Sequence, residues 1–422
     1  MKRTIMILAV AVMARSAELD NKTLNHKLIM GYQGWFACPG DGRPDGNWVH
    51  WFTRGKATAR TTTVDLLPDV SELDPDERCK TPFMSRAGHP IEVFSSQNPK
   101  TVMRHFRWMK EYGIDGVALQ RFIVGLRPDH VAISDRVLDN VRRAAEANGR
   151  GFFIMYDVAG ADSQTWAAQM EEDWRRLQAE GITRGPAYLS HRGHPVVAIA
   201  GFGSEENRPP TPVTGAACLA RMREISKAYG GVTLFGTLPG SWRKAEDWAS
   251  VYRSFDVVSP WTVGRFADNA GADRDRKNIL APDLAEARQL GIDYMPVVFP
   301  GFSWLNLMTV RGQTEERHSV SNQIRRNCGD FYWHQVENAV QEGATMLYGA
   351  MFDEVDEGTA MFKIVANRKD LPDSPPFVPL DADGCALPSD WYLQLASKTA
   401  AMLHGELKPS GKLPLAVPGE RK

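Results

Sequence analysis

Eight short apolar runs recur along the chain, and they constrain its fold more than any other feature of the sequence. Each run is continuously apolar and ends at turn-forming or polar residues, which is typical of parallel strands buried on both faces. Their order predicts eight strands of one sheet. The runs span residues 27–36, 113–122, 151–160, 194–203, 231–240, 255–265, 292–304 and 344–354.

Segments with the pattern of amphipathic helices lie between most of these runs. The segment 99–113 keeps Val102 and Phe106 near one helical face, and the segment 134–149 ends at Gly149, a common helix terminator. Alternating strands and helices predict the α/β class, and eight such units predict a (β/α)₈ TIM barrel. An open doubly wound sheet is the alternative, although the first strand-to-helix turn lacks the pattern GxGxxG.

Two segments do not follow this strand–helix order. Residues 37–97 are a long insertion after the first strand, rich in Pro, Gly, Asp and Thr, and we expect a lid or a small hairpin subdomain over the barrel mouth. Residues 405–422 are rich in Pro, Gly and Lys and predict a disordered tail. Residues 18–404 predict a single barrel domain that contains the insertion.

The first residues have the pattern of a secretory signal peptide. Lys2 and Arg3 precede an apolar stretch that is too short to span a bilayer, and small residues follow it. Residues 1–17 therefore predict a cleaved signal and a secreted or periplasmic protein, whereas a disordered or buried N-terminal segment is the alternative. No other segment of the sequence reaches the length of a transmembrane helix.

Charge and cysteine content exclude several classes of partner. The formal net charge is −1, so the chain has no global field that would attract nucleic acid or anionic lipid. The five cysteines include no CxxC pair and no His pair at zinc spacing, so we expect no metal site. Cys38 and Cys79 bracket a long loop and are the expected disulfide pair, and the odd count leaves at least one free thiol. The sequence does not indicate an oligomeric state.

Aromatic and hydrogen-bonding side chains follow most of the predicted strands. In barrels of this kind the active site lies at the carboxyl ends of the strands, so these side chains should share one rim. Their mixture suits a carbohydrate, whose C–H faces pack on aromatic rings while its hydroxyl groups pair with planar polar groups. The expected substrate-binding residues are Tyr32, Trp35, Gln120, Arg121, Asp157, Trp261, Arg265, Trp304 and Asn306.

Some of these residues also have a structural interpretation. Arg121 and Asp157 could form a buried ion pair at the end of the barrel. Trp35 and Trp304 could close the core, and Arg265 could lie at the surface. Barrel geometry alone does not decide between these roles and ligand binding.

The stretch GAMFDEVDEGTAMF, residues 349–362, places four carboxylates after the eighth apolar run. Two carboxylates that flank a sugar are the requirement for glycoside hydrolysis, and their mutual repulsion keeps one of them protonated near neutral pH. Glu354 and Glu357 can face one cavity if the chain turns there, so we predict that they are catalytic and need no cofactor. A solvated acidic loop or a Ca²⁺ site is the alternative, but the cluster lacks the alternation and length of an EF-hand loop.

Six motifs, in this order, resemble glycoside hydrolase families 99 and 71, which include endo-α-mannosidases. Family 99 has roughly Trp-Asn-Glu-Trp-His-Glu where this chain has Phe352 to Glu357, so the chain resembles a divergent relative, of the kind sometimes labelled xylosidase or arabinosidase. The motifs are GYQGWF at 31–36, DGVALQRF at 115–122, FFIMYDVAG at 152–160, SPWTVGR at 259–265, MPVVFPGFSW at 295–304 and MFDEVDEGTAMF at 351–362.

The resemblance implies a (β/α)₈ barrel that cleaves α-glycosidic bonds with retention of configuration. It also implies a Glu-x-x-Glu pair after the last strand, which maps onto Glu354 and Glu357. The first Glu would act as base on the 2-hydroxyl of the sugar, giving a 1,2-anhydro intermediate, and the second would act as general acid and later as the base for water.

We therefore expect an exported glycoside hydrolase that acts on a polysaccharide or oligosaccharide. One competing interpretation is a catalytically inactive barrel that only binds carbohydrate. The other is a barrel whose acidic loop has a structural role and binds Ca²⁺.

Overall fold

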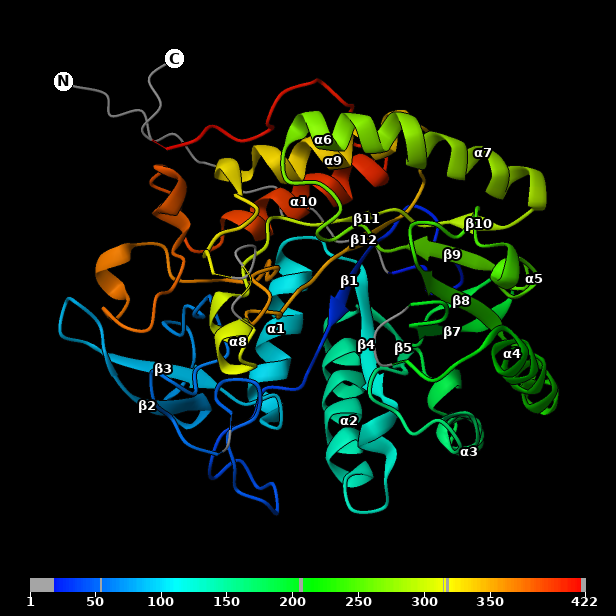
Figure 1. Cartoon of the computed structure of the whole chain (residues 1–422), viewed down its shortest axis with the longest axis horizontal. Coiled ribbons are helices and arrows are strands. Elements are labelled where there is room, and N and C mark those ends of the chain that lie inside the picture. The colour runs from blue at the N-terminus through cyan, green and yellow to red at the C-terminus, as the bar shows by residue number, and fades with distance from the viewer. Residues whose placement is uncertain (1–18, 54, 205–207, 314, 316–318, 419–422) are drawn as a thin grey trace, which may run out of the picture.

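The computed structural model describes residues 19–53, 55–204, 208–313, 315 and 319–418. Its centre is a set of parallel strands with helices on the outside (Figure 1). Every one of the eight predicted runs contains a strand of this set. The parallel strands are β1 (Leu28–Tyr32), β4 (Gly116–Phe122), β5 (Gly151–Asp157), β7 (His194–Ala200), β8 (Thr233–Leu238), β9 (Val257–Pro260), β10 (Asp293–Tyr294), β11 (Val297–Val298) and β12 (Leu347–Gly349).

The barrel closes through the short segment that contains β10 and β11. β10 pairs with β9 and β11 pairs with β12, so these two strands together form the seventh strand of the barrel. Pro296 lies between them and has no N–H to donate, which interrupts the ladder there. Since β12 pairs in turn with β1, the circle is complete. This closure confirms the (β/α)₈ barrel and excludes the open doubly wound sheet.

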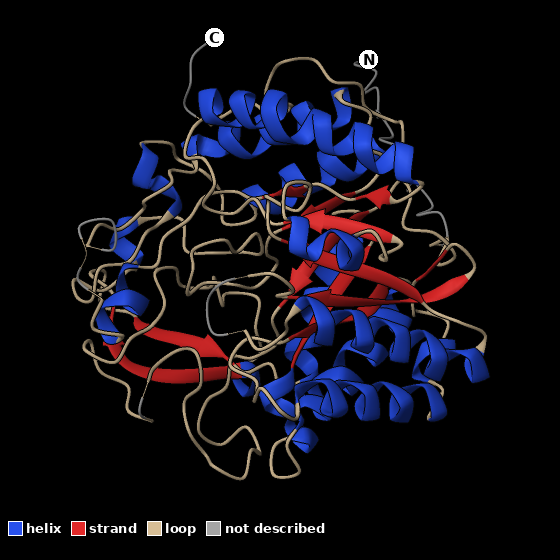
Figure 2. Cartoon of the chain, turned by 45° about the vertical axis from the view of Figure 1, so that its right-hand side comes forward, coloured by secondary structure: helices blue, strands red, loops and turns tan. Residues whose placement is uncertain are grey.

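The helices cover the outer face of the barrel (Figure 2). In α1 (Pro99–Glu111), for example, Val102, Phe106 and Met109 are buried on the side that faces the strands, as an amphipathic helix requires. The others are α2 (Val131–Asn148), α3 (Trp166–Ala179), α4 (Pro212–Ser226), α5 (Ala249–Tyr252), α6 (Asn269–Asp275), a π-helical turn (Arg276–Leu280), α7 (Ala281–Leu290), α9 (Asp330–Gln341) and α10 (Trp391–Leu403). The short helix α8 (Leu305–Val310) instead lies against the insertion, where the amides of Leu305 and Asn306 donate to Asp65.

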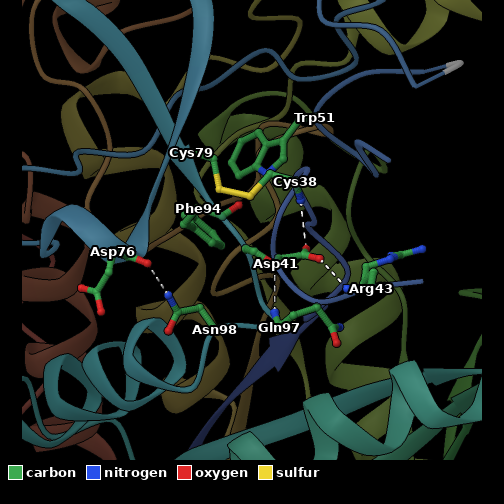
Figure 3. The surroundings of a disulfide bond; sticks show 10 residues. Cys38, Asp41, Arg43, Trp51, Asp76, Cys79, Phe94, Gln97 and Asn98 are labelled. Atoms are coloured by element: carbon green, nitrogen blue, oxygen red, sulfur yellow. Dashed lines mark hydrogen bonds between the residues drawn. A yellow bond between two sulfur atoms is a disulfide. The ribbon is translucent and has the colours of Figure 1, made fainter. Parts of the chain in front are cut away.

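The insertion, residues 37–97, contains an antiparallel hairpin of β2 (Arg78–Met84) and β3 (Pro90–Phe94). A disulfide joins Cys38 at its start to Cys79 in β2, with the two Cα atoms 6.4 Å apart, which confirms the expected pair. The rings of Trp51 and Phe94 lie beside this disulfide (Figure 3), and the Trp51 indole donates to the carbonyl oxygen of Phe94 at 2.8 Å. The bond therefore ties the hairpin to the chain that leaves β1.

The insertion lies against the segment that follows β12, and the two are adjacent in Figure 1. The amides of Arg86 and Ala87 donate to carbonyl oxygens of Leu371 and Lys369, both at 3.0 Å. The amide of Asp65 donates at 3.0 Å to the carbonyl oxygen of Val355. Contacts of this kind bring the insertion to the carboxyl ends of β1 and β12.

A second disulfide, Cys328–Cys385, was not expected from the sequence; its Cα atoms are 6.0 Å apart. It connects the turn just before α9 to the segment before α10. Cys218 in α4 is a free thiol and is buried, so the expected free cysteine is a core residue.

The two ends of the chain bear on the remaining predictions. Residues 1–17, the predicted signal peptide, lie outside the described residues. Residues 405–418 differ from the disorder expected for 405–422, because Leu407 and Leu413 pack on the core and Glu337 accepts hydrogen bonds from the amides of Ser410 and Gly411 at 2.7 and 2.9 Å. Among the described residues, no helix has the length and apolarity needed to cross a bilayer.

Candidate active site

The residues after β12 form an acidic turn, defined here as 353–361, at the carboxyl end of the barrel. Asp353 fixes its first residue, because its carboxylate accepts hydrogen bonds from the amides of Gln33 and Gly34 at 2.7 and 2.9 Å. Burial raises the pKa of Asp353 to about 7, against the opposing effect of these two donors. Asp353 thus connects the chain after β12 to the chain after β1, and both of its carboxylate oxygens are occupied by backbone donors.

Backbone contacts fix the other side of the acidic turn. The amide of Ser303 donates to the carbonyl oxygen of Glu357 at 3.0 Å. The buried guanidinium group of Arg326 donates to the carbonyl oxygens of Gly358 and Ala360 at 2.9 and 2.7 Å. Gly358 has φ +65°, and a Cβ atom there would approach the backbone of Ser303 to 2.7 Å, so only glycine fits.

Glu354 is buried in this turn, with 4% of its surface exposed. The amide nitrogen of Gln33 donates to its Oε1 at 2.5 Å, and the hydroxyl of Thr359 donates to its Oε2 at 2.6 Å. Burial, together with the charges of Glu357 and Asp356, raises the pKa of Glu354 well above its usual value. The two donors oppose that rise because they stabilise the charged form.

Glu357 is half-buried, and its side chain has no hydrogen-bond partner within the described part of the chain. Burial and the charge of Asp356 raise the pKa of Glu357 to about 7, while Arg311 and Arg208 lower it. Because Glu357 also raises the pKa of Glu354, the two carboxyl groups are electrostatically coupled.

Asp356 connects the acidic turn to the insertion. Its Oδ2 lies 3.0 Å from Nδ1 of His50. The His50 ring stacks on Trp35, with 3.7 Å between ring centroids and an interplanar angle of 5°, and the other face of Trp35 packs on Phe122 at 5.4 Å. The structure therefore places Trp35 beside the acidic turn, although both faces of its ring are already covered.

The barrel interior beneath Glu354 is lined by side chains from several strands. The amide of Gln120 in β4 donates to Sδ of Met155 in β5 at 3.1 Å, and the Tyr348 hydroxyl in β12 lies 3.8 Å from the same sulfur. The Oε1 atoms of Gln33 and Gln120 are buried, and neither has a hydrogen-bond partner within the described residues. Two acceptors thus remain unpaired beside the acidic turn.

Two predicted binding residues point away from the barrel axis. Tyr32 is fully buried, and its hydroxyl lies 2.9 Å from Nδ1 of His105 in α1. Arg121 is 3% exposed and forms ion pairs with Asp173 and Asp135, each at 2.7 Å. Successive strand residues face opposite sides, so Tyr32 and Arg121 lie on the helix side of β1 and β4 while Gln33 and Gln120 face inward. The structure therefore does not bring Tyr32 and Arg121 into the barrel interior, and Arg121 pairs with Asp173 and Asp135 rather than with Asp157.

Asp157 and Trp261 lie at the carboxyl ends of their strands, as expected. Burial raises the pKa of Asp157, opposed by its hydrogen bond from the Ala159 amide and by the charge of Arg208. The Trp261 ring centroid is 6.2 Å from that of Tyr348. Both residues therefore lie near the residues that surround Glu354.

The last three predicted residues make contacts within the loops. Arg265 donates to the carbonyl oxygen of Trp261 at 2.6 Å and pairs with Asp275 of α6 at 3.2 Å. Asn306 is buried and donates to carbonyl oxygens of Val64 and Pro376 at 2.9 and 2.7 Å. Trp304 precedes α8, and its ring centroid lies 4.9 Å from that of Phe302. The side-chain amide of Asn306 is thus already occupied by backbone carbonyl oxygens of Val64 and Pro376.

The structure adds residues that were not predicted, chiefly Gln33, His50 and Thr359. Gln33 follows Tyr32 directly, so strand alternation could have identified it. His50 has no such signal, because its contact with Asp356 joins positions 306 residues apart. No group of three or more His, Cys, Asp or Glu side chains in the described ranges is arranged to hold a metal ion.

Comparison with solved structures relates this geometry to known proteins. The GH99 endo-α-mannosidase from Bacteroides thetaiotaomicron, in complex with BIS-TRIS-propane, has a TM-score of 0.64 and 17% identity, covering 91% of this chain and 99% of that chain. This chain has the GH99 endo-α-mannosidase fold. A second structure of that enzyme gives a TM-score of 0.63 and 16% identity over the same shares of both chains.

A protein described as glycoside hydrolase-like is more distant from this chain. It has a TM-score of 0.50 and 14% identity, covering 75% of this chain and 89% of its own. No protein-family model matches the chain, and no curated protein matches it. The likeness to GH99 is therefore one of fold, and the chemistry of this chain has to be argued from its own residues.

Proposed function

We propose that this chain is a glycoside hydrolase that cleaves α-glycosidic bonds of a polysaccharide or oligosaccharide with retention, using Glu354 and Glu357. The observation that carries the proposal is the coupled, largely buried carboxylate pair at the carboxyl end of a closed barrel. Burying two neighbouring carboxyl groups costs folding free energy, and groups perturbed in this way are concentrated at functional sites. The GH99 fold agrees with this assignment.

In the first proposed step, Glu354 removes a proton from the 2-hydroxyl of the sugar. The 2-oxygen then bonds to the anomeric carbon as the glycosidic bond breaks, and Glu357 donates its proton to the leaving oxygen. In the second step Glu357 takes a proton from water, the water oxygen attacks the anomeric carbon, and Glu354 returns a proton to the 2-oxygen. Two inversions give net retention.

The surroundings of the two carboxyl groups support Glu354 as the base and Glu357 as the acid. Gln33 and Thr359 donate to both oxygens of Glu354, which favours its charged form and suits a base. Glu357 has a pKa raised to about 7 and no side-chain partner among the described residues, which suits a group that gives and takes a proton at neutral pH. Burial acts in the opposite direction, because it raises the pKa of Glu354 well above its usual value.

The substrate and location are also proposals. The GH99 neighbours are endo-α-mannosidases, so α-mannosides are the first substrates to test. We also propose that the protein is exported, on the basis of the signal-like residues 1–17, and that the activity belongs to one domain within residues 18–404. The test is release of reducing sugar from a panel of α- and β-linked glycans, with product configuration followed by NMR. A retained α-product supports the proposal, and no release from any glycan, or an inverted product, contradicts it.

A further inference from the structure

We propose that His50 contacts the substrate, presenting Nε2 as an acceptor to a sugar hydroxyl and the open face of its imidazole to the sugar ring. The inference rests on the proposed glycosidase function and adds a residue from the insertion to that site. His50 would make the insertion a determinant of which glycan is bound.

The backbone of the insertion holds His50 next to the acidic turn. His50 has φ +58°, in the left-handed region that few non-glycine residues adopt. The hydroxyl of Thr63 donates to its carbonyl oxygen and fixes this conformation. Unusual backbone conformations of this kind concentrate at functional sites.

His50, Trp35 and Phe122 form a stack of three rings, with His50 at one end. Phe122 and His50 cover the two faces of Trp35, so Trp35 has no free face for a sugar. His50 retains 34% side-chain exposure, against 3% for its partner Asp356. The part of the imidazole that Trp35 leaves exposed is a suitable platform for the C–H face of a sugar.

The hydrogen bond to Asp356 sets the tautomer of neutral His50. Oδ2 of a carboxylate can only accept, so Nδ1 carries the proton and Nε2 is left as an acceptor. The Trp35 indole N–H and Oδ1 of Asp356 are buried beside it, and within the described residues neither has a partner. The two residues that contact the His50 ring, Trp35 and Asp356, thus retain one donor and one acceptor that the described part of the chain leaves unpaired.

The test combines kinetics with NMR. His50→Asn tolerates the left-handed backbone but lacks the ring, and His50→Phe keeps the stack but lacks both nitrogens. The substrate is the oligosaccharide that the wild type cleaves best in the glycan panel. We expect KM to rise about tenfold in each variant, the value of roughly one hydrogen bond and its packing. Each variant should remain folded, with a melting temperature lowered by the loss of the hydrogen bond to Asp356. His194→Asn, at the start of β7 on the opposite end of the barrel, is the matched control and should behave as wild type.

The NMR measurement of the His50 tautomer needs no substrate. The ¹⁵N shifts of histidine-labelled protein, assigned by difference with His50→Asn, should show the Nδ1–H tautomer for neutral His50. An Nε2–H tautomer, or KM values within about twofold of wild type in both variants, overturns the inference. If Glu357→Gln abolishes cleavage while both His50 variants match wild type, only the role of His50 fails. If the wild type cleaves no glycan, the proposed function fails and this inference fails with it.

Discussion

The side-chain amide of Gln33 donates a hydrogen bond to Oε1 of Glu354 across 2.5 Å. The contact links the residue after β1 to the turn after β12, two neighbouring strands of the barrel. With Thr359 on the second oxygen, it orients the Glu354 carboxylate and stabilises its charge. Gln33 is therefore a positioning residue for the proposed base.

Replacing Gln33 with Met should lower kcat without unfolding the protein. The side chain keeps its length but loses the donor, and a hydrogen bond to a charged group contributes enough for a loss of about 10- to 100-fold. The acid limb of the kcat profile should also move to higher pH, because the charged form of Glu354 loses a stabilising donor. Gln394→Met in α10, away from the barrel mouth, serves as control. An unchanged pH profile would show that Gln33 has only a packing role.

The pH dependence of kcat/KM should report the acid Glu357. Its pKa is raised to about 7, and a general acid must be protonated, so activity should fall as the pH rises above about 7. Asp356→Asn removes a charge that raises this pKa, so the alkaline limb should move to lower pH. Steady-state rates at pH 5 to 9 check this, with the exposed Asp373→Asn as control. If the alkaline limb of the profile stays at the same pH in Asp356→Asn, a group other than Glu357 causes that limb.

The strand pattern explains how far the sequence could predict this site. Continuous apolar runs located all the barrel strands, because parallel strands are buried on both faces. Because these runs are apolar at every position, their pattern does not show which residues point into the barrel. Gln120 and Arg121 are adjacent, so only one can face the axis, and the partner that holds Arg121 outside, Asp173, lies on α3. The two-residue period of a strand would have placed Gln120 and Arg121 on opposite faces. It would also have favoured Gln33 over Tyr32 as the residue that faces the barrel axis.

Long-range contacts could not be predicted in this way. His50 reaches Asp356 only because the insertion folds back over the segment after β12, and no local pattern encodes that return. Asn306 appeared to follow the seventh strand at the mouth, but its amide instead joins the insertion to residue Pro376. Loop residues of this kind take their role from partners far along the chain.

The buried His105 should make stability depend on pH. Burial lowers the pKa of His105 to about 3 from 6.5, so the folded protein binds fewer protons than the unfolded chain between these values. The free energy of unfolding should therefore fall as the pH is lowered from 6.5 towards 3. His105→Gln preserves a hydrogen-bonding partner for Tyr32 and should reduce this slope in urea unfolding. An identical slope in the variant would contradict the assignment, and His194→Gln is the surface control.

A chelator separates the catalytic interpretation from a structural Ca²⁺ loop. Asp353, Glu354 and Asp356 are each engaged by donors from the protein, which leaves them poorly arranged as a cage of six to eight oxygens. We expect the melting temperature to be the same with and without EDTA. A marked decrease that added Ca²⁺ reverses would favour the structural role.

The most direct measurement compares Glu354→Gln and Glu357→Gln on two substrates, a glycan and a glycosyl fluoride of the same sugar. Each variant should remain folded and lose about 10²- to 10⁴-fold in kcat on the glycan. The fluoride needs little protonation to leave, so it should restore much of the activity of Glu357→Gln and little of that of Glu354→Gln. Rescue of Glu354→Gln instead would reverse the roles, and full activity of both variants on the glycan would place the catalytic site elsewhere, with Asp157 the next carboxylate to test.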